Sequence, residues 1–167
     1  MINFLNKKFS IYFLIVSAIF FLDRFSKIYV ISESKKNLSP DLFSSKFLNI
    51  SLIWNEGIAF GLFSFEENHF YNFLTILIAI IIIIIFFMIF KNEGMKKHAL
   101  LMILGGALGN LYDRVFFNAV PDFIDFHIGN FHWFIFNVSD IFISLGVLFL
   151  IFLELIDNQK SKINDKN

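Results

Sequence analysis

FYNFLTILIAIIIIIIFFMIF, residues 70–90, is an apolar stretch with almost no polar side chain. An α-helix rises about 1.5 Å per residue, so a helix of this length crosses the roughly 30 Å hydrocarbon core of a bilayer. Three more apolar runs of similar length occur at residues 9–31, 98–117 and 134–156. The sequence therefore predicts four transmembrane helices, of which residues 70–90 form a lipid-facing anchor.

The composition agrees with a membrane protein and limits its chemistry. Hydrophobic residues make up 57% of the 167 residues and charged residues only 17%. The formal net charge of zero gives no basic surface of the kind that binds nucleic acid. Cysteine is absent, which excludes disulfides, thiolate metal sites and a Cys nucleophile. Chemistry must come from Asp, Glu, His, Ser or Lys.

Lysine is distributed unevenly between the two sides that four crossings define. One side carries Lys35, Lys36 and Lys46, whereas the other carries Lys7, Lys8, Lys91, Lys96, Lys97, Lys160, Lys162 and Lys166. Because Lys and Arg are retained in the cytoplasm, both termini are predicted to be cytoplasmic. Residues 32–69 and 118–133 are then outer loops, and residues 157–167 are predicted to be a disordered tail. The chain is predicted to form one integral membrane domain, residues 1–167.

The two outer loops differ in pattern. Residues 47–54 alternate polar and apolar side chains, as a strand does, and a turn at Asn55-Glu56-Gly57 follows. We expect a small extracytoplasmic β-sheet there. The second loop is rich in aromatic residues, which favour the headgroup region, and we expect it to lie at the membrane surface over a site.

Ionisable residues within the apolar runs are the strongest functional signal, because a charge near the bilayer centre costs about 2.5–3.5 kcal/mol or more. They are Asp23, Arg24, Lys27, Asp113, Arg114 and Asp140. The basic side chains near helix ends could instead be interfacial anchors. The short Asp side chains are predicted to face the bundle interior.

Helical spacing supports an inward-facing polar seam. Asp23 and Lys27 are four residues apart, and Asn137 and Asp140 are three apart. Asn110, Asp113 and Arg114 lie within about one turn of each other. We expect Arg114 to neutralise Asp113 and the Asn amides to orient a carboxylate or a peptide carbonyl. A network that only holds the helices together would show the same spacing.

Carboxylates at the outer surface indicate one specific chemistry. Asp122 lies in the second outer loop and Asp140 at the outer end of the fourth helix. Two adjacent carboxylates share a proton, so one can act as a base on water and the other as an acid, as in aspartyl proteases. From spacing alone, Asp125 is an equally good partner for Asp140.

Five motifs spread from residue 22 to residue 140 carry most of these polar residues. They are DRFSK at 23–27, NEGIAFG at 55–61, GGALGNLYDR at 105–114, VPDFIDF at 120–126 and FNVSD at 136–140. In residues and in order, these motifs resemble the lipoprotein signal peptidases, also called prolipoprotein signal peptidase or signal peptidase II. Pro121 and Ser139 depart from the family pattern, where an aliphatic residue and Ala are usual.

The resemblance implies a membrane aspartyl endopeptidase with Asp122 and Asp140 as the catalytic dyad, in preference to Asp125. It implies site-supporting or substrate-binding roles for Asp23, Lys27, Asn55, Gly57, Asn110, Asp113, Arg114 and Asn137. The implied fold is a four-transmembrane-helix bundle with a small extracytoplasmic sheet and a surface loop over the active site.

The resemblance also implies the partners and the location. The substrate would be a prolipoprotein with a diacylglyceryl-modified Cys, cleaved on the amino side of that Cys, and globomycin would inhibit the reaction. No metal or organic cofactor is expected. The protein would act as a monomer among the lipids of the bacterial inner membrane, without nucleic acid. The alternatives are a proton- or cation-coupled transporter and a non-enzymatic membrane assembly subunit; inverted repeats, typical of many transporters, are not apparent.

Overall fold

The computed structural model describes the backbone of residues 2–56 and 67–164 and the side chains of residues 8–56 and 71–159. It contains four long helices, α1 (Ile2–Asn37), α2 (Glu67–Lys91), α3 (Gly94–Phe117) and α4 (Val138–Asn164). All four are long and apolar enough to cross a membrane. Helices suit this environment because every internal backbone polar group is bonded within the helix. The predicted fold class, four membrane-spanning helices with a small sheet, is confirmed.

Helix α3 is the central helix of the bundle. In its most apolar window 56% of the residues are buried, against 11–17% in the other three helices. An apolar core joins α2 to α3; it contains Ile82, Ile85, Ile89, Leu100, Leu101, Ile103, Leu104 and Ala107. The other faces of α2 expose large apolar side chains, as a lipid-facing helix does. Helix α3 is capped by Asn118, which follows its last residue and whose left-handed conformation (φ 54°) is one that Asn tolerates well.

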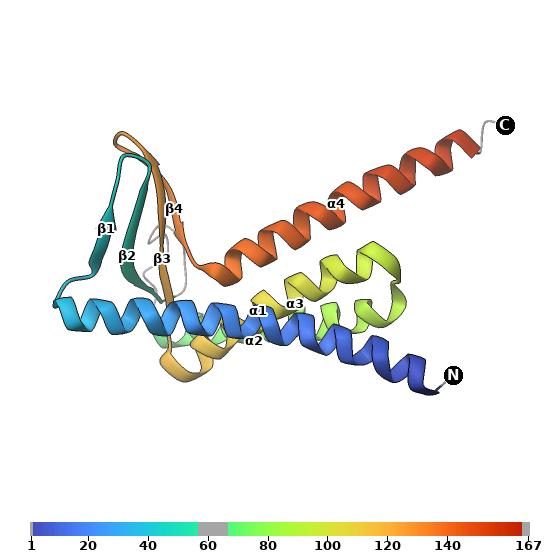
Figure 1. Ribbon diagram of the computed structural model, residues 1–167, viewed down its shortest axis with the longest axis horizontal. Helices are drawn as coiled ribbons and strands as arrows, with labels where there is room; N and C mark the ends of the chain where they lie inside the picture. The colour runs from blue at the N-terminus through green and yellow to red at the C-terminus, as the bar shows by residue number, and fades with distance from the viewer. Residues whose placement is uncertain (1, 57–66, 165–167) are drawn as a thin grey trace.

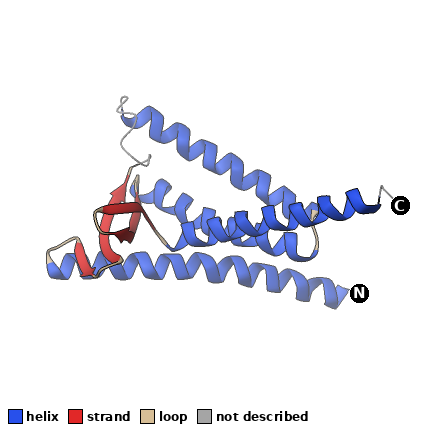
Figure 2. Ribbon diagram, turned by 90° about the horizontal axis from the view of Figure 1, so that it is seen from above, coloured by secondary structure: helices blue, strands red, loops and turns tan. Residues whose placement is uncertain are grey.

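Four strands form one antiparallel sheet in the order β1 (Asp41–Ser44), β2 (Leu48–Asn55), β3 (Val120–Ile128) and β4 (Phe131–Phe136). Figure 1 shows the sheet at one end of the helices and both termini at the opposite end. Figure 2, seen from above, shows the same separation. The sheet therefore covers a single end of the bundle.

The structure differs from the predicted boundaries at several places. The strand predicted at residues 47–54 is present as β2, but residues 120–136, predicted as surface loop and helix start, form the β3–β4 hairpin. Aromatic residues at a membrane surface suit an extended strand as well as a loop, so the composition alone was ambiguous.

Helix α4 continues through Asn164, so the disordered tail predicted from residue 157 does not hold over most of its length. Counting apolar residues locates only the part of a helix inside the hydrocarbon. Near this end of the bundle, Lys96 of α3 forms ion pairs with Glu154 at 2.8 Å and Asp157 at 2.7 Å on α4. These contacts support the polar extension of α4.

Candidate active site

Asp122 of β3 and Asp140 of α4 are joined by one side chain, that of Asn137. Nδ2 of Asn137 donates a hydrogen bond to Oδ1 of Asp122 at 2.6 Å. Oδ1 of Asn137 accepts a hydrogen bond from the backbone N of Asp140 at 3.2 Å. Because Asn137 is fully buried, this bridge is shielded from water. The two predicted carboxylates therefore belong to one site.

Local helix chemistry places Asp140. Asn137 precedes the first residue of α4, and its backbone N donates to Oδ2 of Asp140 at 3.1 Å while its side chain receives the Asp140 N–H. This reciprocal pair is a capping box at the start of the helix. The first turn also favours a negative charge, because the helix dipole is positive there.

Two more amides complete the contacts of the carboxylates. Asn55, the last residue of β2, donates through Nδ2 to Oδ2 of Asp122 at 2.9 Å. Asn110 of α3 donates through Nδ2 to Oδ1 of Asp140 at 2.8 Å. All four carboxylate oxygens thus accept a hydrogen bond, and each retains lone-pair capacity for a water molecule.

Burial changes the acidity of Asp122, which is only 4% exposed. Its pKa is raised from 3.8 to about 6; loss of solvent contact is the main cause, the hydrogen bonds from Asn55 and Asn137 and the charge of Lys27 act against it, and the charge of Asp140 adds to it. A carboxyl group with this pKa can hold or release a proton near neutral pH. That property is required of a general acid or base.

A buried ionic cluster lies behind the amides and joins α1 to α3. Nζ of Lys27 donates to Asp23 at 2.8 Å, to Asp113 at 2.7 Å and to Oδ1 of Asn110 at 2.9 Å. These three bonds use every donor of the ammonium group. Asp23 in turn accepts the backbone N–H of Ser139 at 3.0 Å, which connects the cluster to α4. Lys27 therefore positions Asn110, and through it Asp140.

Arg24 is a member of the cluster that the sequence left as a candidate interfacial anchor. Its Nη1 lies 2.6 Å from Oδ1 of Asp113, and its guanidinium also lies over the ring of Tyr112 at 4.8 Å. The cluster therefore contains two carboxylates and two cations. Its signal in the sequence was the three-residue spacing of Arg24 and Lys27, which places both on one face of α1.

Arg114 is not where it was expected. It was predicted to neutralise Asp113, but Asp113 is paired with Arg24 and Lys27 instead. Consecutive helical residues point in directions about 100° apart, so neighbours in sequence seldom pair. The Arg114 guanidinium lies 5.6 Å from the ring of Tyr71. Its buried Nε and Nη1 have no hydrogen-bond partner among the described residues.

Asp125, the alternative partner for Asp140, lies three residues beyond Asp122 on β3 and has other contacts. Its carboxylate accepts hydrogen bonds from Asn49 and His132. The structure therefore separates it from the Asp122–Asp140 pair. Gly57, which was also predicted to support the site, lies outside the described residues.

Gly109 of α3 lets α1 and α4 approach the site. A Cβ at this position would lie 2.6 Å from Oδ2 of Asp23 and would also overlap Oγ of Ser139. Ser139 is fully buried, and its Oγ has no hydrogen-bond partner among the described residues. The small residue at position 139 is thus required by packing.

We expect Gly109→Ala to destabilise the protein by about 1–3 kcal/mol, although Ala normally favours a helix, because the added methyl group overpacks the contact with α4. Thermal unfolding in detergent would measure the effect. Ser139→Ala alone should be neutral or slightly stabilising and should partly rescue Gly109→Ala, since it removes one of the two overlapping atoms. An unchanged unfolding temperature in Gly109→Ala would contradict this packing.

An apolar cavity of about 460 Å³ adjoins one of the two carboxylates. Asp140 lines it together with aromatic side chains of β3 and β4 and apolar side chains of α4, among them Phe126, Trp133 and Ile141. A larger cavity of about 1050 Å³ lies between α1, α2 and α3, and neither Asp122 nor Asp140 lines it. The smaller cavity can therefore hold an apolar ligand next to Asp140.

Comparisons with known proteins identify the family of this chain. The family model described as signal peptidase (SPase) II matches residues 15–156. The lipoprotein signal peptidase of Pelagibacter ubique (strain HTCC1062) is 49% identical over 161 residues, which is 96% of each chain. That of Anaplasma phagocytophilum (strain HZ) is 39% identical over 152 residues, 90% of this chain and 94% of the relative.

The fold has also been seen in a crystallised relative. A bacterial membrane enzyme solved by the in meso method at 2.3 Å resolution superposes with a TM-score of 0.76 and 31% identity, covering 90% of this chain and 91% of the other. The sequence match extends over most of the chain and includes all the residues that surround Asp122 and Asp140. This chain belongs to the signal peptidase II family.

Proposed function

We propose that this protein is the membrane aspartyl endopeptidase that removes signal peptides from bacterial prolipoproteins carrying a diacylglyceryl-modified Cys. Family membership supports the activity, and the relatives are named lipoprotein signal peptidases. The observation that carries the proposal is the bridge of Asn137 between Asp122 and Asp140. It gives a buried carboxylate, Asp122, and a half-buried one, Asp140, a fixed relation around a position where one water molecule can react.

The reaction follows from a singly protonated pair. The negative charge is best placed on Asp140, where the helix dipole favours it, and the proton on Asp122, whose pKa is raised to about 6. Asp140 takes a proton from the water molecule as the water oxygen attacks the peptide carbonyl carbon. Asp122 protonates the carbonyl oxygen. Asp140 then returns the proton to the leaving nitrogen, the C–N bond breaks, and Asp122 regains its proton from the collapsing diol.

The substrate would reach this pair from the lipid. The apolar cavity beside Asp140 suits the apolar residues or acyl chain next to the scissile bond, so little apolar surface needs to enter water. Nε and Nη1 of Arg114, which have no hydrogen-bond partner among the described residues, suit a peptide carbonyl of the substrate. We propose cleavage on the amino side of the lipidated Cys, by a monomer in the bacterial inner membrane and without nucleic acid or cofactor.

The decisive experiment uses purified protein in detergent and a precursor with or without the diacylglyceryl group. We expect cleavage of the modified precursor, inhibition by globomycin and little cleavage of the unmodified one. A transporter or an assembly subunit would cleave neither. Failure to cleave the modified precursor, with the protein shown to be folded by a cooperative thermal transition, would reject the proposal.

We propose that both termini are cytoplasmic and that the sheet is external. The lysine distribution supports this orientation. Reporter fusions at Asn92, between α2 and α3, should report the cytoplasm, and fusions at Asn130, in the β3–β4 turn, should report the outer side. An external signal at Asn92 would reverse the topology and place the carboxylates on the wrong side for a secreted precursor.

A further inference from the structure

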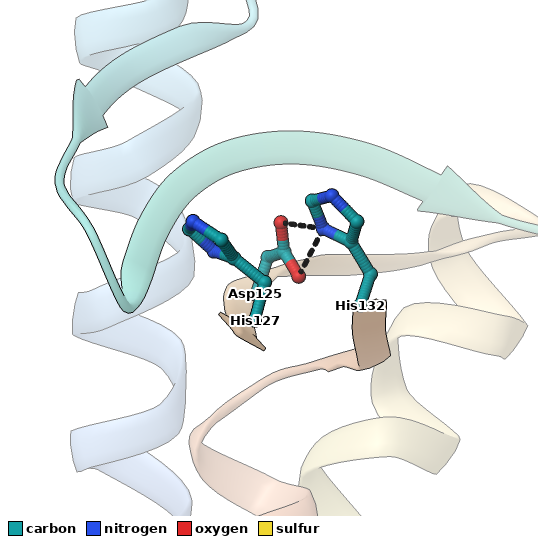
Figure 3. A group of neighbouring side chains, drawn as sticks. All are labelled: Asp125, His127 and His132. Carbon is teal, nitrogen blue, oxygen red and sulfur yellow. Dashed lines mark hydrogen bonds and ion pairs between the residues drawn. The ribbon is translucent and has the colours of Figure 1, made fainter. Parts of the chain in front are cut away.

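Three side chains that commonly bind metals gather on the β3–β4 hairpin, apart from the carboxylate pair. They are Asp125 and His127 of β3 and His132 of β4, shown in Figure 3. One donor atom from each lies within 4.8 Å of the other two. None of these residues hydrogen-bonds to the Asn55, Asn110 and Asn137 amides that hold the carboxylate pair, as far as the described contacts show.

The register of the hairpin produces this arrangement. His127 and His132 are directly opposite each other on neighbouring antiparallel strands, so their side chains emerge on the same face. Their rings are stacked, with centroids 5.0 Å apart and planes 21° from parallel. Asp125 is two residues before His127 on β3 and so points to the same face, although the pairing with β4 shifts between these two residues. Two imidazoles and a carboxylate are thus presented together by the backbone itself.

The carboxylate is held in place by His132 and by a polar residue of the neighbouring strand β2. Asp125 is 4% exposed, and Nδ1 of His132 lies 2.8 Å and 3.0 Å from its two oxygens. Nδ2 of Asn49, opposite Asp125 on β2, donates to Oδ2 at 3.1 Å. Oδ1 of Asn49 accepts a bond from Oγ of Ser44 at 2.8 Å. Supporting bonds of this kind orient the ligands in metal sites and tune their affinity.

One donor atom of the cluster is left unsatisfied. Nδ1 of His127 is inaccessible to solvent and has no hydrogen-bond partner among the described residues. A buried polar atom without a partner costs about 1–3 kcal/mol, so such an atom calls for an explanation. A metal ion bound between the two imidazoles and Asp125 would provide its partner.

We propose that Asp125, His127 and His132 bind one divalent transition-metal ion, with Zn²⁺ as the best match. Two imidazole nitrogens and one carboxylate oxygen suit Zn²⁺, which water would complete to four ligands, whereas Mg²⁺ and Ca²⁺ prefer oxygen ligands alone. His132 is 52% exposed on its side chain, which gives the ion a path from the outer surface. The ion would tie β4 to β3 three residues beyond Asp122 and so stiffen the strand that carries this carboxylate.

Equilibrium dialysis of the full-length protein, purified without a polyhistidine tag and stripped with a chelator, tests the site. We expect one Zn²⁺ per chain and a higher unfolding temperature with Zn²⁺ present. Replacing Zn²⁺ by Co²⁺ should give the visible absorption bands of a four-coordinate site. His127→Gln and His132→Gln should each weaken binding by roughly 100-fold or more, and the supporting Asn49→Ala by about 10–100-fold.

His98→Gln is the matched control, because Nδ1 of His98 already contacts the carbonyl oxygen of Gly94 on α3. It should leave the Zn²⁺ affinity and the Co²⁺ spectrum unchanged. Since His132 is half exposed, His132→Gln should fold even if His127→Gln does not. The proposal is overturned if the protein does not bind one Zn²⁺ per chain at a free Zn²⁺ concentration of about 100 µM. It is also overturned if binding persists unchanged in His132→Gln.

Discussion

Asp122→Asn and Asp140→Asn should each lose on the order of 10³-fold or more in cleavage rate, because each removes the charge or the proton that the reaction uses. Asn is nearly isosteric with Asp, so the substrate should still bind. The double variant should be scarcely slower than either single variant, since the two carboxyl groups act as one unit. Cleavage of a diacylglyceryl-modified precursor by purified variants measures the loss.

The stability of Asp122→Asn separates lost chemistry from lost folding. A carboxyl whose pKa is raised from 3.8 to about 6 binds its proton more tightly in the folded protein than in the unfolded chain. The free energy of unfolding therefore falls as pH rises through this window, by about 3 kcal/mol in all. At neutral pH the Asn variant avoids this cost, so it should unfold at an equal or higher temperature than the natural protein.

The pH profile of cleavage gives a second test of the pair. The reaction needs one proton on the pair, but both carboxyl groups are protonated at low pH and both are ionised at high pH. The plot of rate against pH should therefore be bell-shaped, and its two apparent pKa values belong to the pair and not to either Asp alone. The alkaline limb should lie no lower than about 6, where Asp122 loses its proton. Bound substrate that excludes water from the site should move the alkaline limb to higher pH.

Two comparison variants make the assignment specific. Asp41→Asn changes a carboxylate of β1 that contacts Ser51 at the exposed edge of the sheet, and it should retain full turnover. Full turnover in Asp122→Asn or Asp140→Asn would overturn the pair. A larger loss of cleavage rate in Asp125→Asn than in Asp122→Asn would assign the catalytic role on β3 to Asp125 instead of Asp122.

The helices were predictable because a single physical requirement, apolar length, defines them. The polar residues of the site were predictable as a group, since an Asp inside an apolar run has to find partners. Sequence reasoning failed where partner choice depends on direction around a helix: Asp113 pairs with Arg24 and Lys27, not with its neighbour Arg114.

The bridge through Asn137 and the hairpin register depend on tertiary contacts. The reciprocal cap of Asn137 and Asp140 was visible as a three-residue spacing. The further bond from Asn137 to Asp122 was not, because Asp122 lies on a strand that was predicted as loop. The pairing of His127 with His132 likewise needs the turn at Gly129, which has a positive φ of 60°. The position of the turn sets the register of a hairpin, so it must be known before the side chains that face each other can be predicted.

Lys27→Met should be the most destabilising substitution in the membrane-embedded part of the site. Lys27, Asp23 and Asp113 are all fully buried, and the four charges of the cluster, with Arg24, sum to zero. Met fills a similar volume but leaves one carboxylate uncompensated, at a cost of about 3–5 kcal/mol. Asn110 also loses its contact with Lys27, so cleavage activity should fall together with stability.

Lys36→Met is the matched control, because Lys36 lies on the same helix and contacts Glu33 at 2.7 Å but is well exposed. An exposed pair contributes only about 0–1 kcal/mol, so this variant should unfold almost like the natural protein. Asp23→Asn combined with Lys27→Met should recover part of the lost stability, since neutrality returns and the amide oxygen can still accept the Ser139 N–H. Equal unfolding temperatures for Lys27→Met and Lys36→Met, measured in the same detergent, would show that the buried cluster does not hold α1 against α3.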